Sequence, residues 1–195
     1  MICMISMPNP KRSRNPRQFV FPYDGRHLLI VPTDIKTTCL LYDRIPYTSV
    51  GVQKFVHRLQ PLLTPHLRSA DFNRDWGSNQ RLKHPMCGAC VPATQAVFYA
   101  FDTDNLVPHR AVDGDGMMHW WCEDKNTGDV IDASAPQYTD NGVLPPYEGG
   151  ASADWYGWKG NTQIRSLRLL NRVLRDSQLY EVDGDDYTPP GMLPV

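Results

Sequence analysis

The chain has 195 residues, of which 41% are hydrophobic, so its composition allows one ordinary folded core. Its formal net charge is −1, from 20 Lys and Arg residues against 21 Asp and Glu residues. This balance gives no overall basic field, so we expect no nucleic-acid partner. The longest apolar runs, such as residues 28–31, are far shorter than a membrane span, so we expect no membrane partner either.

Cysteine content and the order of the first residues favour a reducing cytoplasm. Five cysteines are an odd number, which argues against a secreted disulfide framework. A signal peptide carries its charge before its apolar stretch, whereas here the basic residues come second. We interpret residues 1–17 as a flexible basic arm, residues 18–180 as a single catalytic-like α+β domain, and residues 181–195 as a loose acidic, Pro-rich tail.

The first part of the domain is predicted to contain strands followed by a helix. Three short apolar runs rich in β-branched and aromatic residues favour extended segments, and Asp24 with Gly25 favours a turn between the first two. These runs are residues 19–21, 28–31 and 39–42. Helical spacing of the next apolar residues predicts an amphipathic helix that opens at Thr48 or Ser49 and ends near Pro61.

A second helix is predicted to begin at a cysteine. Residues 64–86 are polar and irregular, and they lead directly to Cys90. Pro92 suits a first helical turn, and the apolar residues that follow, up to Phe101, share one helical face. Cys90 is therefore expected at or just before a helix N-terminus.

A hairpin, a loop and a closing helix are predicted to follow. Residues 117–123 and 129–133 have the composition of two strands joined by a glycine turn. His109 is assigned to the loop before this hairpin, and residues 139–160 to a long loop rich in glycine, proline and aromatic residues. Asn161 is a candidate cap for the closing helix.

Cys90, His119 and Asp132 together have the residue types of a nucleophile, a base and a group that orients the base. The free N–H groups and the dipole of a helix N-terminus favour a thiolate, and they can also hold an oxyanion. A hairpin places residues of its two strands side by side, so Asp132 can fix the tautomer of His119. We expect the thiol beside one imidazole nitrogen and the carboxylate bonded to the other.

The residues around this trio resemble the transglutaminase core and, more broadly, papain-like enzymes. His119 followed by Trp120 on one strand, then a glycine turn and Asp132 on the next, is similar to that pattern. Residues 88–94 are similar to its cysteine-bearing helix start. The resemblance implies that Cys90 acts as nucleophile, His119 as base and Asp132 as orienter.

A narrower resemblance is to small bacteriophage proteins that share a Cys-x-x-Ala-[ST]-x-Ala helix, a His-Trp strand and an Asp-x-[ST]-x-x-Gln-[FY] segment. Here that segment is 132–138, and Gln137 occupies the shared Gln position. The chain departs from the group at Met86-Cys87, which leaves the second oxyanion donor unassigned. Asn79 and Gln80 are candidates by side-chain type, because papain-like enzymes place a Gln upstream of the cysteine.

Zinc binding is the main alternative chemistry. Cys87, Cys90, His119 and Cys122 have ligand-like spacing, and the first pair could form a knuckle. His119 and Cys122 are three residues apart, however, so on a strand they point to opposite faces. A zinc deaminase requires a His-x-Glu motif upstream of its cysteines, and this chain has none there.

Purely structural roles also fit several of these residues. Cys90 could be a small buried hydrophobe, His119 a satisfied core histidine, and Asp132 a turn residue. Trp155 and Trp158 could form a substrate lid or simply anchor their loop on the core.

The sequence thus predicts an α+β fold with a papain-like or transglutaminase-like core, in which the Cys90 helix packs on a small antiparallel sheet that carries His119 and Asp132. The expected activity is that of a cysteine hydrolase or acyltransferase acting on an amide or ester carbonyl, without a metal or cofactor. Its substrate would be a peptide, a protein or a small amide or ester, with a host protein or virion component among the partners. The alternative is a zinc-stapled or inactive interaction module of a phage particle or phage–host complex.

Overall fold

The computed structural model of the protein describes residues 20–32, 36–68, 79–153 and 163–183. Helices and small, mainly antiparallel sheets are mixed along the chain, which confirms the α+β class. The helices are α1 (Ser49–Leu59), α2 (Gln80–Lys83), α3 (Cys90–Ala100), α4 (Pro136–Thr139) and α5 (Ile164–Val173), with the 3-10 turns η2 (Gln60–Leu62), η3 (Pro65–Leu67) and η5 (Tyr147–Gly149). The strands are β1 (Val20–Tyr23), β2 (Arg26–Pro32), β3 (Lys36–Tyr42), β4 (Ile45–Pro46), β5 (Phe101–Asp102), β6 (Leu106–Val112), β7 (Met118–Asp124), β8 (Val130–Ile131), β9 (Ala151–Ser152) and β10 (Gln178–Asp183).

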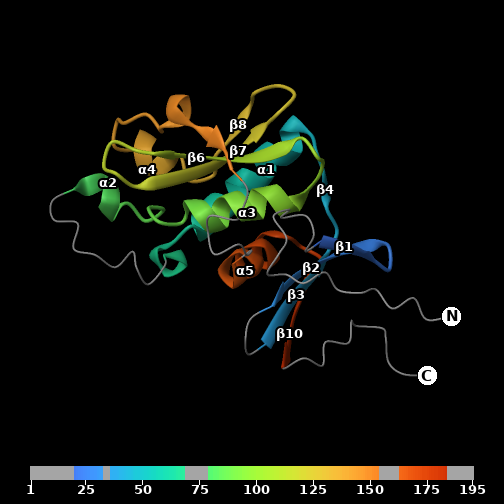
Figure 1. Cartoon of the computed structure of the whole chain (residues 1–195). Coiled ribbons are helices and arrows are strands. Elements are labelled where there is room, and N and C mark those ends of the chain that lie inside the picture. The colour runs from blue at the N-terminus through green and yellow to red at the C-terminus, as the bar shows by residue number, and fades with distance from the viewer. Residues whose placement is uncertain (1–19, 33–35, 69–78, 154–162, 184–195) are drawn as a thin grey trace, which may run out of the picture.

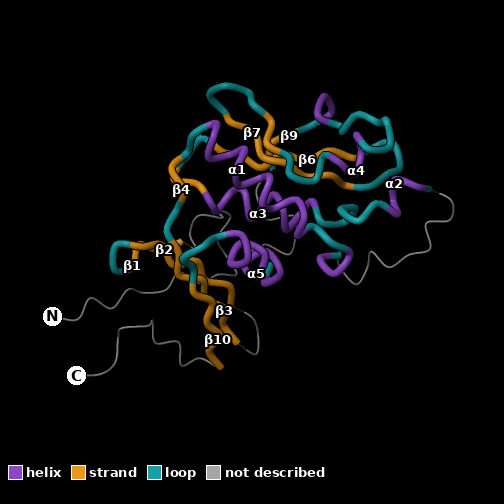
Figure 2. Tube along the Cα trace, turned by 180° about the vertical axis from the view of Figure 1, so that it is seen from behind, coloured by secondary structure: helices purple, strands orange, loops and turns teal. Residues whose placement is uncertain are grey.

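Helix α3 lies at the centre of the molecule, between a sheet on one side and helix α5 on the other (Figures 1 and 2). The sheet above it has the order β8-β7-β6-β9, and α5 packs in turn against β3 and β10 of the second sheet, β1-β2-β3-β10. Every residue of α3 except Val91 is buried, as expected of a helix that is apolar around its whole circumference. Burial on both sides fixes Cys90, the first residue of α3, relative to the sheet.

The sheet β1-β2-β3-β10 confirms the strands expected near the N-terminus. Asp24 and Gly25 have φ values of 47° and 74°, the positive angles that a tight two-residue hairpin turn needs. Side chains alternate between two apolar clusters: Leu29 faces the main core, whereas Leu28 faces a smaller cluster on the other side of the sheet. Strand β10 continues to Asp183, past residue 181 where the sequence places the start of the tail.

The sheet above α3 carries the expected hairpin with a shorter second strand. Strand β7 agrees with the predicted segment to within one residue, whereas β8 contains only Val130 and Ile131. Asp132 therefore lies just beyond the strand and not within it. The backbone turns there because the Asp132 side chain accepts a hydrogen bond from the Ser134 N–H at 2.8 Å, which competes with further pairing of the strand.

Strand β6 was not predicted, and the assignment of His109 to a loop is wrong. His109 lies in the middle of β6 and pairs with Trp121 of β7. Pro108 concealed the strand, because proline lacks the N–H that a ladder uses and normally argues against a strand. Here the Pro108 carbonyl still accepts a hydrogen bond from the Ala153 N–H at 2.8 Å.

The predicted helices are present, and one cap is identified. Thr48 caps α1 by accepting a hydrogen bond from the Gly51 N–H at 3.0 Å. Helix α5 begins at Ile164, and Asn161, its expected cap, lies outside the described residues, as does the arm at 1–17.

None of the helices in the described ranges is long and apolar enough to cross a membrane.

Candidate active site

Cys90 begins α3, as the sequence predicted. The chain approaches it through Gly88, whose φ of 83° favours glycine, and through a turn in which the Ala89 N–H donates to the Met86 carbonyl at 3.0 Å. The first N–H groups of a helix have no intrahelical acceptor, so this end of α3 favours negative charge. Cys90 is 6% exposed, and its Sγ lies 3.8 Å from the Met118 carbonyl oxygen at the start of β7.

His119 follows Met118 on β7 and makes the expected pair with Asp132. His119 Nε2 and Asp132 Oδ2 are 2.7 Å apart, and both side chains are buried. His119 Nδ1 is also buried, and no described residue completes a hydrogen bond with it. Since Asp132 holds Nε2, Nδ1 is the imidazole nitrogen that remains for a further partner.

Asp132 is held by three further donors, from Ser134 and Tyr147. Its Oδ1 accepts hydrogen bonds from the Ser134 N–H and hydroxyl, each at 2.8 Å. Its Oδ2 accepts the Tyr147 hydroxyl at 2.9 Å in addition to His119. Both carboxylate oxygens are therefore fully engaged, which fixes the orientation of the group that orients His119.

Charge interactions favour an ionised pair. Burial favours a neutral imidazole, but the charge and hydrogen bond of Asp132, followed by the Cys90 thiol, raise the pKa of His119 to about 10. Burial likewise opposes ionisation of Asp132, but the charge of His119 and the hydrogen bonds from His119 and Ser134 hold the pKa of Asp132 below its usual value. The two shifts together favour a charged His119 beside a charged Asp132.

Aromatic rings enclose the imidazole. Trp121 stacks on His119 with ring centres 5.9 Å apart, and Tyr138 meets the same ring edge-on at 4.7 Å. Tyr147 packs edge-on against Trp121 at 5.1 Å. Gly150 lies so close to the Trp121 ring that a Cβ there would come within 2.3 Å of it. These ring contacts fix the plane of the imidazole.

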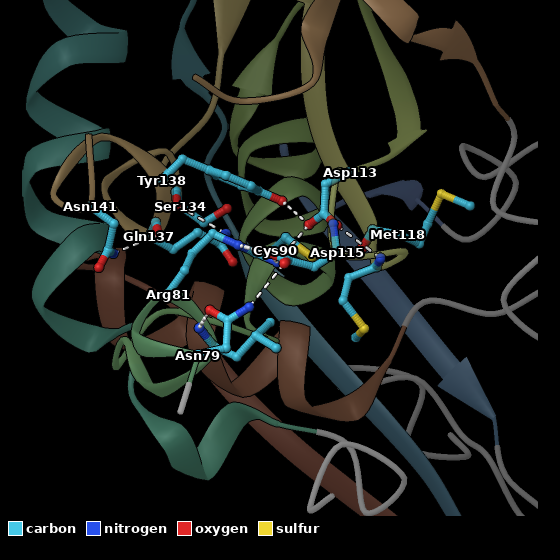
Figure 3. A network of polar contacts seen from close by, with 12 residues as sticks. Asn79, Arg81, Cys90, Asp113, Asp115, Met118, Ser134, Gln137, Tyr138 and Asn141 are labelled. Carbon is cyan, nitrogen blue, oxygen red and sulfur yellow. Dashed lines mark hydrogen bonds and ion pairs between the residues drawn. The ribbon is translucent and has the colours of Figure 1, made fainter. Parts of the chain in front are cut away.

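A second polar network lies beside the cysteine (Figure 3). Buried Arg81 of α2 forms an ion pair with Asp113 at 3.0 Å and a hydrogen bond with Asp115 at 2.6 Å. The Tyr138 hydroxyl donates to Asp113 at 2.8 Å, and the Arg81 guanidinium lies over the Tyr138 ring. This network fixes Tyr138, which in turn contacts His119.

The hydrogen bonds of Asn79 do not support a role for its side chain as the second oxyanion donor. The Asn79 amide donates to Asp115 at 2.9 Å, and its oxygen caps α2 by accepting from the Leu82 N–H at 3.3 Å. Both ends of the Asn79 side chain are thus occupied, and the side chain of Gln80 lies outside the described part of the structure.

The alternative zinc site is not formed. Among the described residues no three His, Cys, Asp or Glu side chains are grouped so that they could hold a metal ion. Cys122 instead donates to the Thr94 carbonyl at 3.5 Å, on the face of β7 that packs on α3. His119 and Cys122 are separated because side chains three apart on a strand point to opposite faces.

Sequence reasoning missed Tyr147, Arg81 and Asp113, since none of them belongs to the motifs around Cys90, His119 and Asp132. Tyr138 was recognised only as part of a shared motif. Gln137, whose role the motif left open, is buried and donates to the Ser134 carbonyl at 3.0 Å, so it supports the turn after Asp132. The two tryptophans of the predicted lid, Trp155 and Trp158, lie outside the described residues.

Comparison of the chain with family models, curated proteins and solved structures found no match in any of the three.

Proposed function

We propose that the protein is a cysteine-dependent acyl-transfer enzyme with a papain-like or transglutaminase-like active site. The observation that carries this proposal is the buried His119–Asp132 pair, whose imidazole interacts with Cys90, the first residue of helix α3. A cysteine nucleophile needs these three elements: a favoured thiolate, a proton carrier and a group that orients the carrier.

The first half of the reaction would form a thioester. The Cys90 thiolate attacks the carbonyl carbon of an amide or ester, and the carbonyl oxygen becomes an oxyanion held by N–H groups at the start of α3. The intermediate collapses, the bond to the leaving nitrogen or oxygen breaks, and His119 donates its proton to the leaving group.

The second half would release the acyl group. Water or an amine attacks the thioester carbon while His119 accepts its proton, and the carbon–sulfur bond breaks to regenerate the Cys90 thiolate. Water completes a hydrolase and an amine completes a transferase. The resemblance to bacteriophage proteins adds a host protein or virion component to the substrates worth testing.

The experiment is intact-mass analysis after exposure to 4-nitrophenyl acetate at neutral pH. The wild type should gain one acetyl group with release of nitrophenolate, and peptide mapping should place the group on Cys90. Cys87 is the matched control, because it is also buried, at 2% exposure, and lies three residues away. Cys87→Ser should still acetylate, whereas Cys90→Ser should not.

An inactive interaction module is the competing function, and the low exposure of Cys90 is the observation in its favour. In that case the burial of the thiol would reflect packing alone. Cys90 would then react no faster than Cys87 in the same experiment, and the acyl-transfer proposal would be wrong.

A further inference from the structure

A pocket is lined by Ile45 and Pro46 of β4. Strand β4 lies on the opposite side of the molecule from α2 and α4 (Figure 1). The volume of the pocket is about 260 Å³, and it is bordered by the β3–β4 connection, helix α1 and the turn between α5 and β10. Arg44, Arg58 and Arg175 line it, one from each of these three segments. Nothing in the proposed reaction uses this pocket.

The positive charges of the pocket exceed its negative charges. Three arginines line it against two aspartates, Asp43 and Asp176. Asp43 is already bonded to Arg26 at 3.3 Å, outside the lining. Within the described ranges no carboxylate forms an ion pair with Arg58 or Arg175.

Arg44 also has an unsatisfied donor. Its side chain is only 14% exposed, and its Nε is buried without a hydrogen-bond partner among the described residues. Its closest carboxylate is Asp102, at 3.8 Å, which is too long for a strong hydrogen bond. A buried donor without an acceptor is costly, so the described residues around Arg44 do not fully balance its guanidinium group.

From these observations we infer that the pocket binds the phosphate group of a small phosphorylated molecule. Guanidinium groups match phosphate oxygens in pairs, and three of them from separate segments can surround one phosphate. Ile45 and Leu174 provide an apolar wall for the carbon part of the ligand. The pocket is slightly smaller than typical ligand sites, so the ligand is small, and a long polymer such as a nucleic acid is not its natural occupant.

The test is isothermal titration of the whole chain with inorganic pyrophosphate and with glycerol 3-phosphate, at constant ionic strength. The variant Arg58→Gln/Arg175→Gln removes two exposed side chains of the pocket and is expected to fold. The control variant Lys83→Gln/Lys125→Gln removes two exposed charges elsewhere. The dissociation constant for both ligands should rise at least about tenfold in the first variant and stay unchanged in the control.

Three results would overturn the inference: absence of measurable binding to the wild type, equal weakening in the two variants, or tighter binding of a short single-stranded oligonucleotide than of pyrophosphate. Equal weakening would mean that net charge alone attracts the ligand. None of these measurements involves Cys90, so the pocket and the thiol chemistry are tested separately.

Discussion

The two ends of strand β7 each hold a buried thiol and a carboxylate, but only one end looks catalytic. At its start, the His119 imidazole is bonded to Asp132 and interacts with Cys90. At its end, Cys122 bonds to a helix carbonyl, and Asp124 bonds to the Tyr47 hydroxyl at 2.7 Å and to N–H groups of the following turn. Burial of a thiol and a carboxylate is therefore not enough, since a titratable group must connect them.

The charges around the thiols also differ between the two ends of β7. Burial and the charge of Asp132 raise the pKa of Cys122, so this thiol stays protonated and inert. At the other end, the imidazolium of His119 provides the positive charge that a thiolate needs. Substituting corresponding residues at the two ends of β7 is thus a direct test of this difference.

The largest effect is expected for the two cysteines. Cys90→Ser should abolish acetylation by 4-nitrophenyl acetate, because no other group can form the thioester. Cys122→Ser should retain acetylation at Cys90, and any loss should appear in thermal stability instead. Intact-mass analysis and thermal unfolding of both variants provide the measurement. Abolished acetylation in folded Cys122→Ser would contradict the distinction between the two ends.

The next largest effect on the acetylation rate is expected for the two carboxylates. Asp132→Asn should lower the acetylation rate by about 10- to 1,000-fold while the fold persists, since an amide can hold the ring but not stabilise its charge. Asp124→Asn is the matched control at the other end of β7, where the loss should be in stability alone. Stopped-flow detection of nitrophenolate gives both rates, and equal rates would remove Asp132 from the site.

The pH dependence of stability should identify the His119–Asp132 pair. The folded pKa of His119 is raised to about 10, whereas a histidine in an unfolded chain titrates near about 6.5. The folded protein then binds more protons between these values, so this contribution is complete below about pH 6.5 and is lost as the pH rises. We expect the wild type to lose up to about 2 kcal/mol between about pH 6.5 and 8 relative to His119→Gln.

Denaturant unfolding at several pH values provides this comparison. The pH range of the comparison ends near pH 8 because a second group affects stability above it. Burial raises the pKa of Cys87 to about 11, so this thiol adds a similar loss of unfolding free energy once unfolded thiols ionise, above about pH 8.5. Parallel pH profiles for wild type and variant would show that His119 carries no raised pKa in the folded state.

The smallest effect is expected for the tyrosine that supports Asp132. Tyr147→Phe removes one of the donors to Asp132 Oδ2 and leaves the ring contact with Trp121. The free energy of unfolding should fall by about 0.5–1.5 kcal/mol, and the acetylation rate by less than about tenfold. A larger loss of rate would mean that Tyr147 does more than hold the carboxylate.

Local chemistry determined much of this protein from its sequence. Helix α3 could be predicted because Pro92 suits its first turn and its apolar residues share one face. The turn at Asp24 and Gly25 could be predicted because few residues accept positive φ angles. The approach of Asp132 to His119 could be predicted because a hairpin brings their segments together across a short glycine turn, although Asp132 itself lies just beyond β8.

Long-range packing decided the rest. Tyr147 bonds to Asp132, which is 15 residues away in the chain, and Arg81 pairs with Asp113, which is 32 residues away. No local sequence pattern encodes such contacts. The strand that contains His109 is stable despite Pro108, because β7 and β9 pair with it on both sides. The arginine pocket unites three distant segments for the same reason: which charges become neighbours depends on how the elements pack, and only the tertiary structure determines that.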